Sequence, residues 1–216
     1  MDRLRSPTPI ATLCPGATIS PSCKPLRFVA SASPHPPMSF DGAALDVVVS
    51  LRLGLASGGD GDCGFGLWRP PAFPGGDGLL VAWRPGRRHD PSPPRTRDRP
   101  RLSCVHASTL EEALVAAENR NGALASGWPE DDGDASASTC ARTLRVFFDG
   151  SAVEAFTCCG AALATRSYRG GGGRARAGEC GAAASEAVAL HLVALGGEAT
   201  VVTANAWGMC SVWGGG

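Results

Sequence analysis

One stretch in the second half of the chain, residues 144–170, constrains the fold more than any other part. It reads LRVFFDGSAVEAFTCCGAALATRSYRG, and apolar residues recur at every second position, which is the period of a strand with one buried face. Asp149-Gly150 predicts a tight hairpin turn, because glycine adopts the positive φ that such turns require. Cys158-Cys159-Gly160 predicts a second turn. The stretch therefore predicts a meander of three antiparallel strands, at residues 144–148, 153–156 and 163–168.

The same alternation occurs elsewhere in the chain. It predicts further strands at residues 45–53, 65–68, 79–83, 188–194 and 200–206. With the three strands of the meander these make eight candidate strands joined mostly by short turns, which is the pattern of an all-β, antiparallel β-sandwich. We place the predicted sandwich at residues 40–213.

The meander also carries a resemblance to a known family. Its sequence resembles the C-terminal β-sandwich module of glycoside hydrolase family 32, the β-fructofuranosidases, which include invertases and fructan hydrolases. The positions that match the family pattern are Asp149, Ser151, Val153, Glu154, Phe156, Arg166 and Tyr168, whereas Ala155 and Ser167 depart from it. A weaker likeness extends from about Phe40 to Trp213 and fades between Arg84 and Ala141. The resemblance implies the same sandwich fold.

Two segments are expected to lie outside a regular sandwich. Residues 1–39 contain four basic residues against one acid and are rich in serine and proline, which predicts a disordered leader or, alternatively, an organellar transit segment. They have no apolar run of the kind found in secretory signal peptides, and the compartment stays unassigned. Residues 84–141 are expected to be an irregular insertion that begins with a run rich in arginine and proline. Within it, residues 109–120 predict a short helix with a capping box at Thr109 and Glu112.

Composition argues against several classes of partner. Twenty basic residues balance twenty acidic ones, so no net charge favours nucleic acid or an anionic membrane. No apolar run approaches the roughly 20 residues of a membrane helix. The nine cysteines include no CxxC pair, and Cys104 with His106 lacks further ligands, so we predict no metal site. Residues 59–64 formally match GxGxxG, but no helix start follows, so no cofactor is predicted.

No catalytic residue is predicted either. The resemblance implies that the catalytic acids of the family lie in an N-terminal five-bladed propeller. The propeller's nucleophile motif, Trp-x-Asn-Asp-Pro-Asn-Gly, does not occur in this sequence. Arg88-His89-Asp90-Pro91 and Glu179-Cys180 are interpreted as chance fragments of the other two motifs. Asp149 and Glu154 could approach each other across the hairpin, but Asp149 is interpreted as stabilising its turn and Glu154 as pairing with Arg145 or Arg166.

Three hypotheses about function stay open at this point. The chain is a non-catalytic module, truncated or lacking its propeller; or it serves an active β-fructofuranosidase whose catalytic domain is encoded elsewhere; or it binds a carbohydrate or a protein. The chain alone is not expected to be active. Its expected partners are a propeller domain or a second copy, meeting an exposed sandwich face on which Val48, Phe147 and Val193 are candidate contacts.

Overall fold

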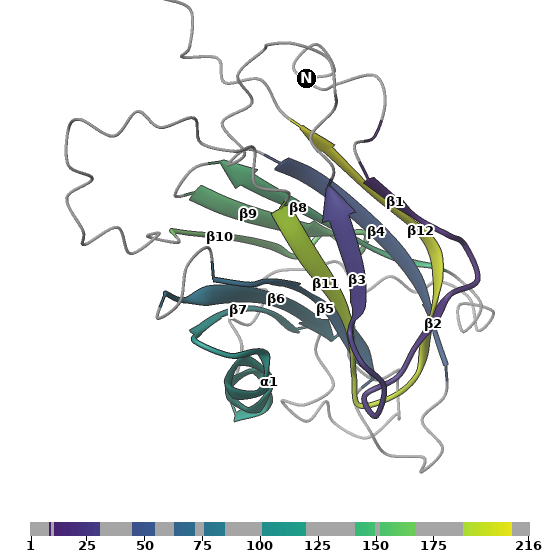
Figure 1. The fold of residues 1–216 in the computed structure, drawn as a ribbon, viewed down its shortest axis with the longest axis horizontal. Helices are drawn as coiled ribbons and strands as arrows, with labels where there is room; N and C mark the ends of the chain where they lie inside the picture. Colours follow the sequence, from purple (N-terminus) through teal and green to yellow (C-terminus); the bar gives the residue numbers. More distant parts are fainter. Residues whose placement is uncertain are drawn as a thin grey trace, which may run out of the picture.

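The computed structural model describes residues 9, 11–30, 45–54, 63–71, 76–84, 101–119, 141–149, 152–166 and 188–208. They form two antiparallel sheets and one helix, α1 (Leu110–Asn119) (Figure 1). The larger sheet has the order β1 (Ala11–Leu13), β12 (Ala199–Gly208), β4 (Leu45–Leu53), β8 (Arg142–Asp149), β9 (Ala152–Thr157) and β10 (Ala162–Arg166), with β2 (Thr18–Ile19) also paired to β12. The smaller sheet has the order β3 (Leu26–Ala30), β11 (Val188–Leu195), β5 (Gly64–Arg69), β6 (Gly78–Arg84) and β7 (Arg101–Ala107). The predicted β-sandwich is confirmed.

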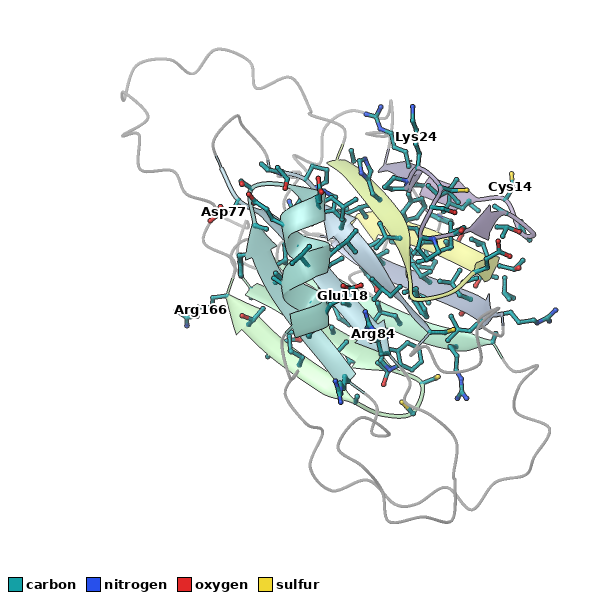
Figure 2. All side chains as sticks on the ribbon, turned by 90° about the horizontal axis from the view of Figure 1, so that it is seen from below. Cys14, Lys24, Asp77, Arg84, Glu118 and Arg166 are labelled. Carbon is teal, nitrogen blue, oxygen red and sulfur yellow. The ribbon has the colours of Figure 1, made fainter. Side chains whose placement is uncertain are left out.

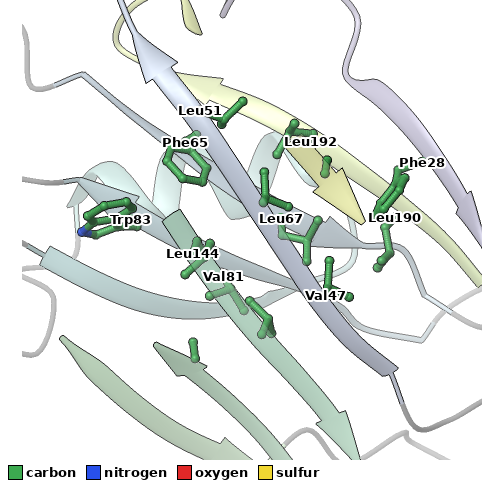
Figure 3. Close-up of a cluster of buried hydrophobic side chains, with 14 of the residues drawn as sticks. Phe28, Val47, Leu51, Phe65, Leu67, Val81, Trp83, Leu144, Leu190 and Leu192 are labelled. Atoms are coloured by element: carbon green, nitrogen blue, oxygen red, sulfur yellow. The ribbon is translucent and has the colours of Figure 1, made fainter. Parts of the chain in front are cut away.

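The core lies between the two sheets and is built by the alternation visible in the sequence. On β8, Leu144, Val146 and Phe148 are at most 1% exposed, whereas Arg145 and Phe147 lie on the opposite side of the strand. Each large apolar side chain buried in this way stabilises the fold by about 1.5–3 kcal/mol. Figure 3 shows side chains of both sheets meeting in this layer, among them Val47, Leu51 and Leu144 from the larger sheet and Phe65, Leu67, Val81 and Trp83 from the smaller one.

The predicted meander is confirmed as β8, β9 and β10. Asp149 pairs with Ala152, so the β8–β9 hairpin is closed by a connection of two residues. In the second turn, Gly160 has a φ of 78° and its N–H donates to the Thr157 carbonyl at 2.8 Å. Strand β10 ends at Arg166, and the remainder of the predicted strand lies outside the described residues.

The N-terminal segment differs from expectation. Residues 11–30, called the N-terminal strap below, supply β1 and β2 to the larger sheet beside β12, and β3 to the smaller sheet beside β11 (Figure 1). Ala11, Ile19 and Phe28 bury their side chains in the core, at 8%, 3% and 2% exposure. The expectation of a leader is therefore wrong for the N-terminal strap. Its strands are too short for the alternation to stand out among the prolines and serines.

The segment expected to be an irregular insertion also contains ordered elements. Strand β7 pairs with β6 along its whole length, so the expectation of irregular chain is wrong for residues 101–107. The predicted helix is confirmed with its capping box: the Glu112 N–H donates to Thr109 Oγ1 at 3.2 Å, and the Thr109 N–H donates to Glu112 Oε2 at 3.3 Å. The Ser108 hydroxyl donates to the same Glu112 oxygen at 2.6 Å.

Helix α1 covers part of the outer side of the smaller sheet (Figure 2). Its Ala113 and Ala117 pack into a second apolar cluster, separate from the core between the sheets, with Trp68, Leu80, Ala82, Val105, Val193 and Leu195. An ion pair of 3.9 Å between Arg84 on β6 and Glu118 on α1 lies at the edge of this contact. Val193 is only 5% exposed, so its predicted place on a bare face is wrong.

Candidate binding face

The side of the larger sheet turned away from the core, called the outward face below, is the candidate site. All described strands belong to the two sheets, and α1 packs on β6 and β7 of the smaller sheet. Consequently no other described element lies over the outward face. Because strands alternate their side chains, the outward residues can be identified directly from the pairing register.

Register aligns the outward residues in two adjacent rows that cross the sheet from β12 to β10. The first row is Trp207, Asp46, Phe147, Glu154 and Ala164. The second row is Asn205, Val48, Arg145, Phe156 and Ala162. The two rows therefore combine three aromatic rings, one guanidinium and two carboxylates with small apolar residues near the β10 edge.

An ion pair between a buried acid and a partly exposed arginine connects these two rows. Asp46 is only 1% exposed, and both of its carboxylate oxygens accept hydrogen bonds from Arg145, at 3.0 Å from Nε and 2.9 Å from a terminal guanidinium nitrogen. The Arg145 side chain is 43% exposed. A buried carboxylate is costly without such a partner, so Arg145 holds Asp46 in place and is itself fixed by it. Sequence reasoning missed Asp46, because β4 and β8 are far apart in the chain.

Two phenylalanine rings extend the contact between Asp46 and Arg145 toward solvent. The Arg145 guanidinium lies over the Phe147 ring, 4.4 Å from its centroid. Phe147 in turn meets Phe156 edge to face, with centroids 6.0 Å apart and planes at 81°. Phe156 is 41% exposed, which is unusual for a ring of this size. The contacts lead without interruption from a buried acid to an exposed ring.

Glu154 makes no ion pair among the described residues. It is exposed, and register places it between Phe147 and Ala164. The expected pairing of Glu154 with Arg145 is wrong, because Arg145 binds Asp46 instead. The expected pairing with Arg166 is not formed either; Arg166 is in register with Ala152, and Figure 2 shows its side chain at the end of β10, pointing away from the sheet.

The other residues weighed from the sequence give no second site in the described part of the chain. Cys104 and His106 lie on the same side of β7, and no group of three or more metal-ligating side chains occurs among the described residues. Residues 59–62, 88–91 and 179–180 lie outside the described residues, as does Gly150. No helix among the described residues is long and apolar enough to cross a membrane.

The outer side of the smaller sheet carries a histidine whose pKa is shifted. His191 on β11 is in register with Arg27 on β3 and with Trp68 on β5. Partial burial lowers the pKa of His191 below its ordinary value of 6.5, and the positive charge of Arg27 lowers the pKa further. The neutral imidazole is therefore the form that this position favours.

No protein-family model matches the sequence, and no curated protein matches it. Solved structures that are similar include an exo-inulinase from Aspergillus awamori, with 18% identity and a TM-score of 0.47. A fructan 1-exohydrolase IIa from Cichorium intybus has 16% identity and a TM-score of 0.46, and a β-fructofuranosidase from Schwanniomyces occidentalis has 10% and 0.49. These matches cover 97%, 97% and 98% of this chain but 31%, 36% and 35% of theirs. The chain thus spans about a third of each matched chain, and no activity follows from likeness at this level.

Proposed function

We propose that this chain is a non-catalytic β-sandwich module of a β-fructofuranosidase-like protein of glycoside hydrolase family 32. The observation that supports this is the placement of the family-like residues. Val153, Glu154, Phe156 and Arg166 lie on consecutive paired strands of one meander, and the meander is part of a two-sheet sandwich. A chance likeness in sequence would not be expected to coincide with one structural unit.

The described carboxylates support a role without catalysis. A retaining glycosidase needs two carboxyl groups about 5–5.5 Å apart that flank the sugar, one as nucleophile and one as acid. Asp46 is only 1% exposed and both of its oxygens accept hydrogen bonds from Arg145, so a sugar has no access to this carboxylate. Glu154 stands exposed on the face of a sheet, whereas a catalytic acid is held in a pocket whose walls fix its position. We therefore assign neither residue a catalytic role.

Carboxylate variants test this proposal in an assay of fructose release from sucrose, raffinose and inulin. Wild type, Glu154→Gln and Glu179→Gln are all expected to match a buffer blank, with an authentic invertase as the positive control. Wild-type turnover that is lost in Glu154→Gln would overturn the proposal and place an active site on the hairpin. Turnover lost in Glu179→Gln would overturn it as well and would identify Glu179-Cys180 as a true acid motif.

The second candidate function is that the chain forms part of an active β-fructofuranosidase, and the exposed outward face favours it. An exposed Phe156 beside half-buried Phe147 is the kind of apolar surface that a partner domain covers. We propose that the module meets its partner, a propeller domain or a second copy of the chain, through this face. A carbohydrate is a further candidate ligand, because an exposed ring beside polar groups also suits sugars. The genomic reading frame upstream of Met1 tests the enzyme candidate: an in-frame propeller with the nucleophile run would support it.

A further inference from the structure

We propose that the outward face of β9 and β10 binds a second copy of this chain as a two-fold symmetric dimer. This inference rests on the function proposed above, since it names the partner of that module's exposed face. Six outward side chains make up the surface, and every one of them is exposed: Ala152, Glu154, Phe156, Ala162, Ala164 and Arg166. The surface therefore carries one large ring, one acid and one base, set among small apolar residues.

The pairing register makes this surface complementary to itself in size. Phe156 lies directly beside Ala162, and Glu154 beside Ala164. A two-fold axis that runs between the strands, parallel to them, exchanges the positions of β9 and β10. Phe156 then faces the partner's Ala162 across the interface. Stacked sheets pack about 10 Å apart, and a large side chain opposite a small one suits that spacing.

The same axis makes the surface complementary in charge. Arg166 lies beside Ala152, one outward position along from the pair formed by Glu154 and Ala164. In the dimer, Glu154 of one copy faces the partner's Ala164. The partner's Arg166 is the next outward residue on the same strand, and symmetry repeats this contact. An isologous interface needs self-complementary charges of this kind, because each residue must suit the position that its own symmetry mate presents. A sugar has no equivalent requirement for one acid and one base at matched positions.

The Phe156 ring, at one end of this surface, is held in place before any partner binds. Phe156 rests against Phe147, which rests against Arg145, which is bonded to the buried Asp46. A side chain that is already fixed loses little conformational freedom on binding, so such rings make effective anchors. Val115 on α1 is the other large apolar side chain that is exposed among the described residues, at 53%, and it has no comparable support.

Sedimentation of the full chain over about 1–200 μM, a range that covers interfaces of modest affinity, tests the proposal. We expect the average mass to rise from one copy to two. Phe156→Glu should stay monomeric over the whole range, whereas Val115→Glu, the same change at an exposed apolar residue on α1, should dimerise like wild type. Circular dichroism confirms that each variant is folded, and Phe156→Ser replaces Phe156→Glu if the latter is not.

Charge reversal supplies the second arm. Glu154→Arg and Arg166→Glu should each weaken the dimer by about fivefold or more, and the double variant should return to within about twofold of wild type. A wild type that stays monomeric, a dimer indifferent to Phe156→Glu, or a double variant no tighter than the singles would overturn the proposal. So would a monomer retained on immobilised inulin through Phe156, which would assign the face to a sugar. None of these outcomes depends on fructose release, so the module's lack of catalysis is tested separately.

Discussion

At the scale of single residues, the ion pair between Asp46 and Arg145 joins β4 to β8 within the larger sheet. Replacing Arg145 with Met removes both hydrogen bonds that the guanidinium donates to the buried Asp46, which should lower the free energy of unfolding by about 2–3 kcal/mol. Arg52→Met is the matched control, because Arg52 is an exposed arginine on β4 and its replacement should change stability by no more than about 0.5 kcal/mol. Urea unfolding measures both, and equal stability of the two variants would show that the ion pair is dispensable.

The hairpin makes a second residue-scale prediction. Because Asp149 pairs with Ala152, Gly150 is the first of two connecting residues, where both common two-residue hairpin turns require φ > 0. Gly150→Val should therefore cost more than about 1–2 kcal/mol, the penalty of a left-handed conformation for an ordinary residue. Thermal melts of Gly150→Val and the control Ser151→Ala test this. A midpoint unchanged by valine would mean that the turn is of another kind.

The third prediction at this scale is that stability depends on pH through His191. Burial first and Arg27 second lower the pKa of His191 in the folded protein below the ordinary 6.5. The unfolded chain therefore binds the proton more tightly, so stability is full above about pH 6.5 and falls as the pH drops below that value toward the folded pKa. Unfolding of wild type and His191→Gln between about pH 5 and 7.5 should show a shallower decline in the variant. Parallel profiles would remove His191 as a cause.

At the scale of elements, the N-terminal strap is the most consequential finding. Phe28 on β3 is 2% exposed in the core, so Phe28→Ala should destabilise the protein by about 3–5 kcal/mol. Lys24→Ala is the control within the same segment, since Lys24 is exposed and points into solvent (Figure 2). Chemical unfolding separates the two. A Phe28→Ala variant as stable as wild type would support the original expectation of a leader.

The elements also show where sequence reasoning works and where it stops. Long alternating strands such as β4, β8 and β12 were predictable, because one face of each packs in the core over many residues. Strands β1 and β2, of three and two residues, are too short for a period to register. Strand β7 follows an arginine- and proline-rich segment, whose composition hides the apolar positions of the strand. The meander was found most completely, since its strands are adjacent in the chain.

The candidate binding face could be predicted only in part. Alternation shows that Phe147 points out of the core, but it does not show which residue stands beside it on the next strand. The contact of Asp46 with Arg145 joins residues 99 positions apart and depends on the pairing of β4 with β8. Val193 has the same outward pattern as Phe147, yet α1 covers it. Exposure is thus a property of tertiary packing, which a strand pattern does not contain.

At the scale of the whole molecule, we propose a sandwich module without catalysis of its own. The most direct test incubates about 10 μM protein with sucrose or inulin for about a day. Typical enzymes turn over at about 1–1,000 s⁻¹, so even a catalyst working at about 0.001 s⁻¹ would release close to 1 mM fructose. No fructose above the buffer blank is expected. Release at that level, retained through repeated purification and lost in Glu154→Gln or Glu179→Gln, would contradict the proposal.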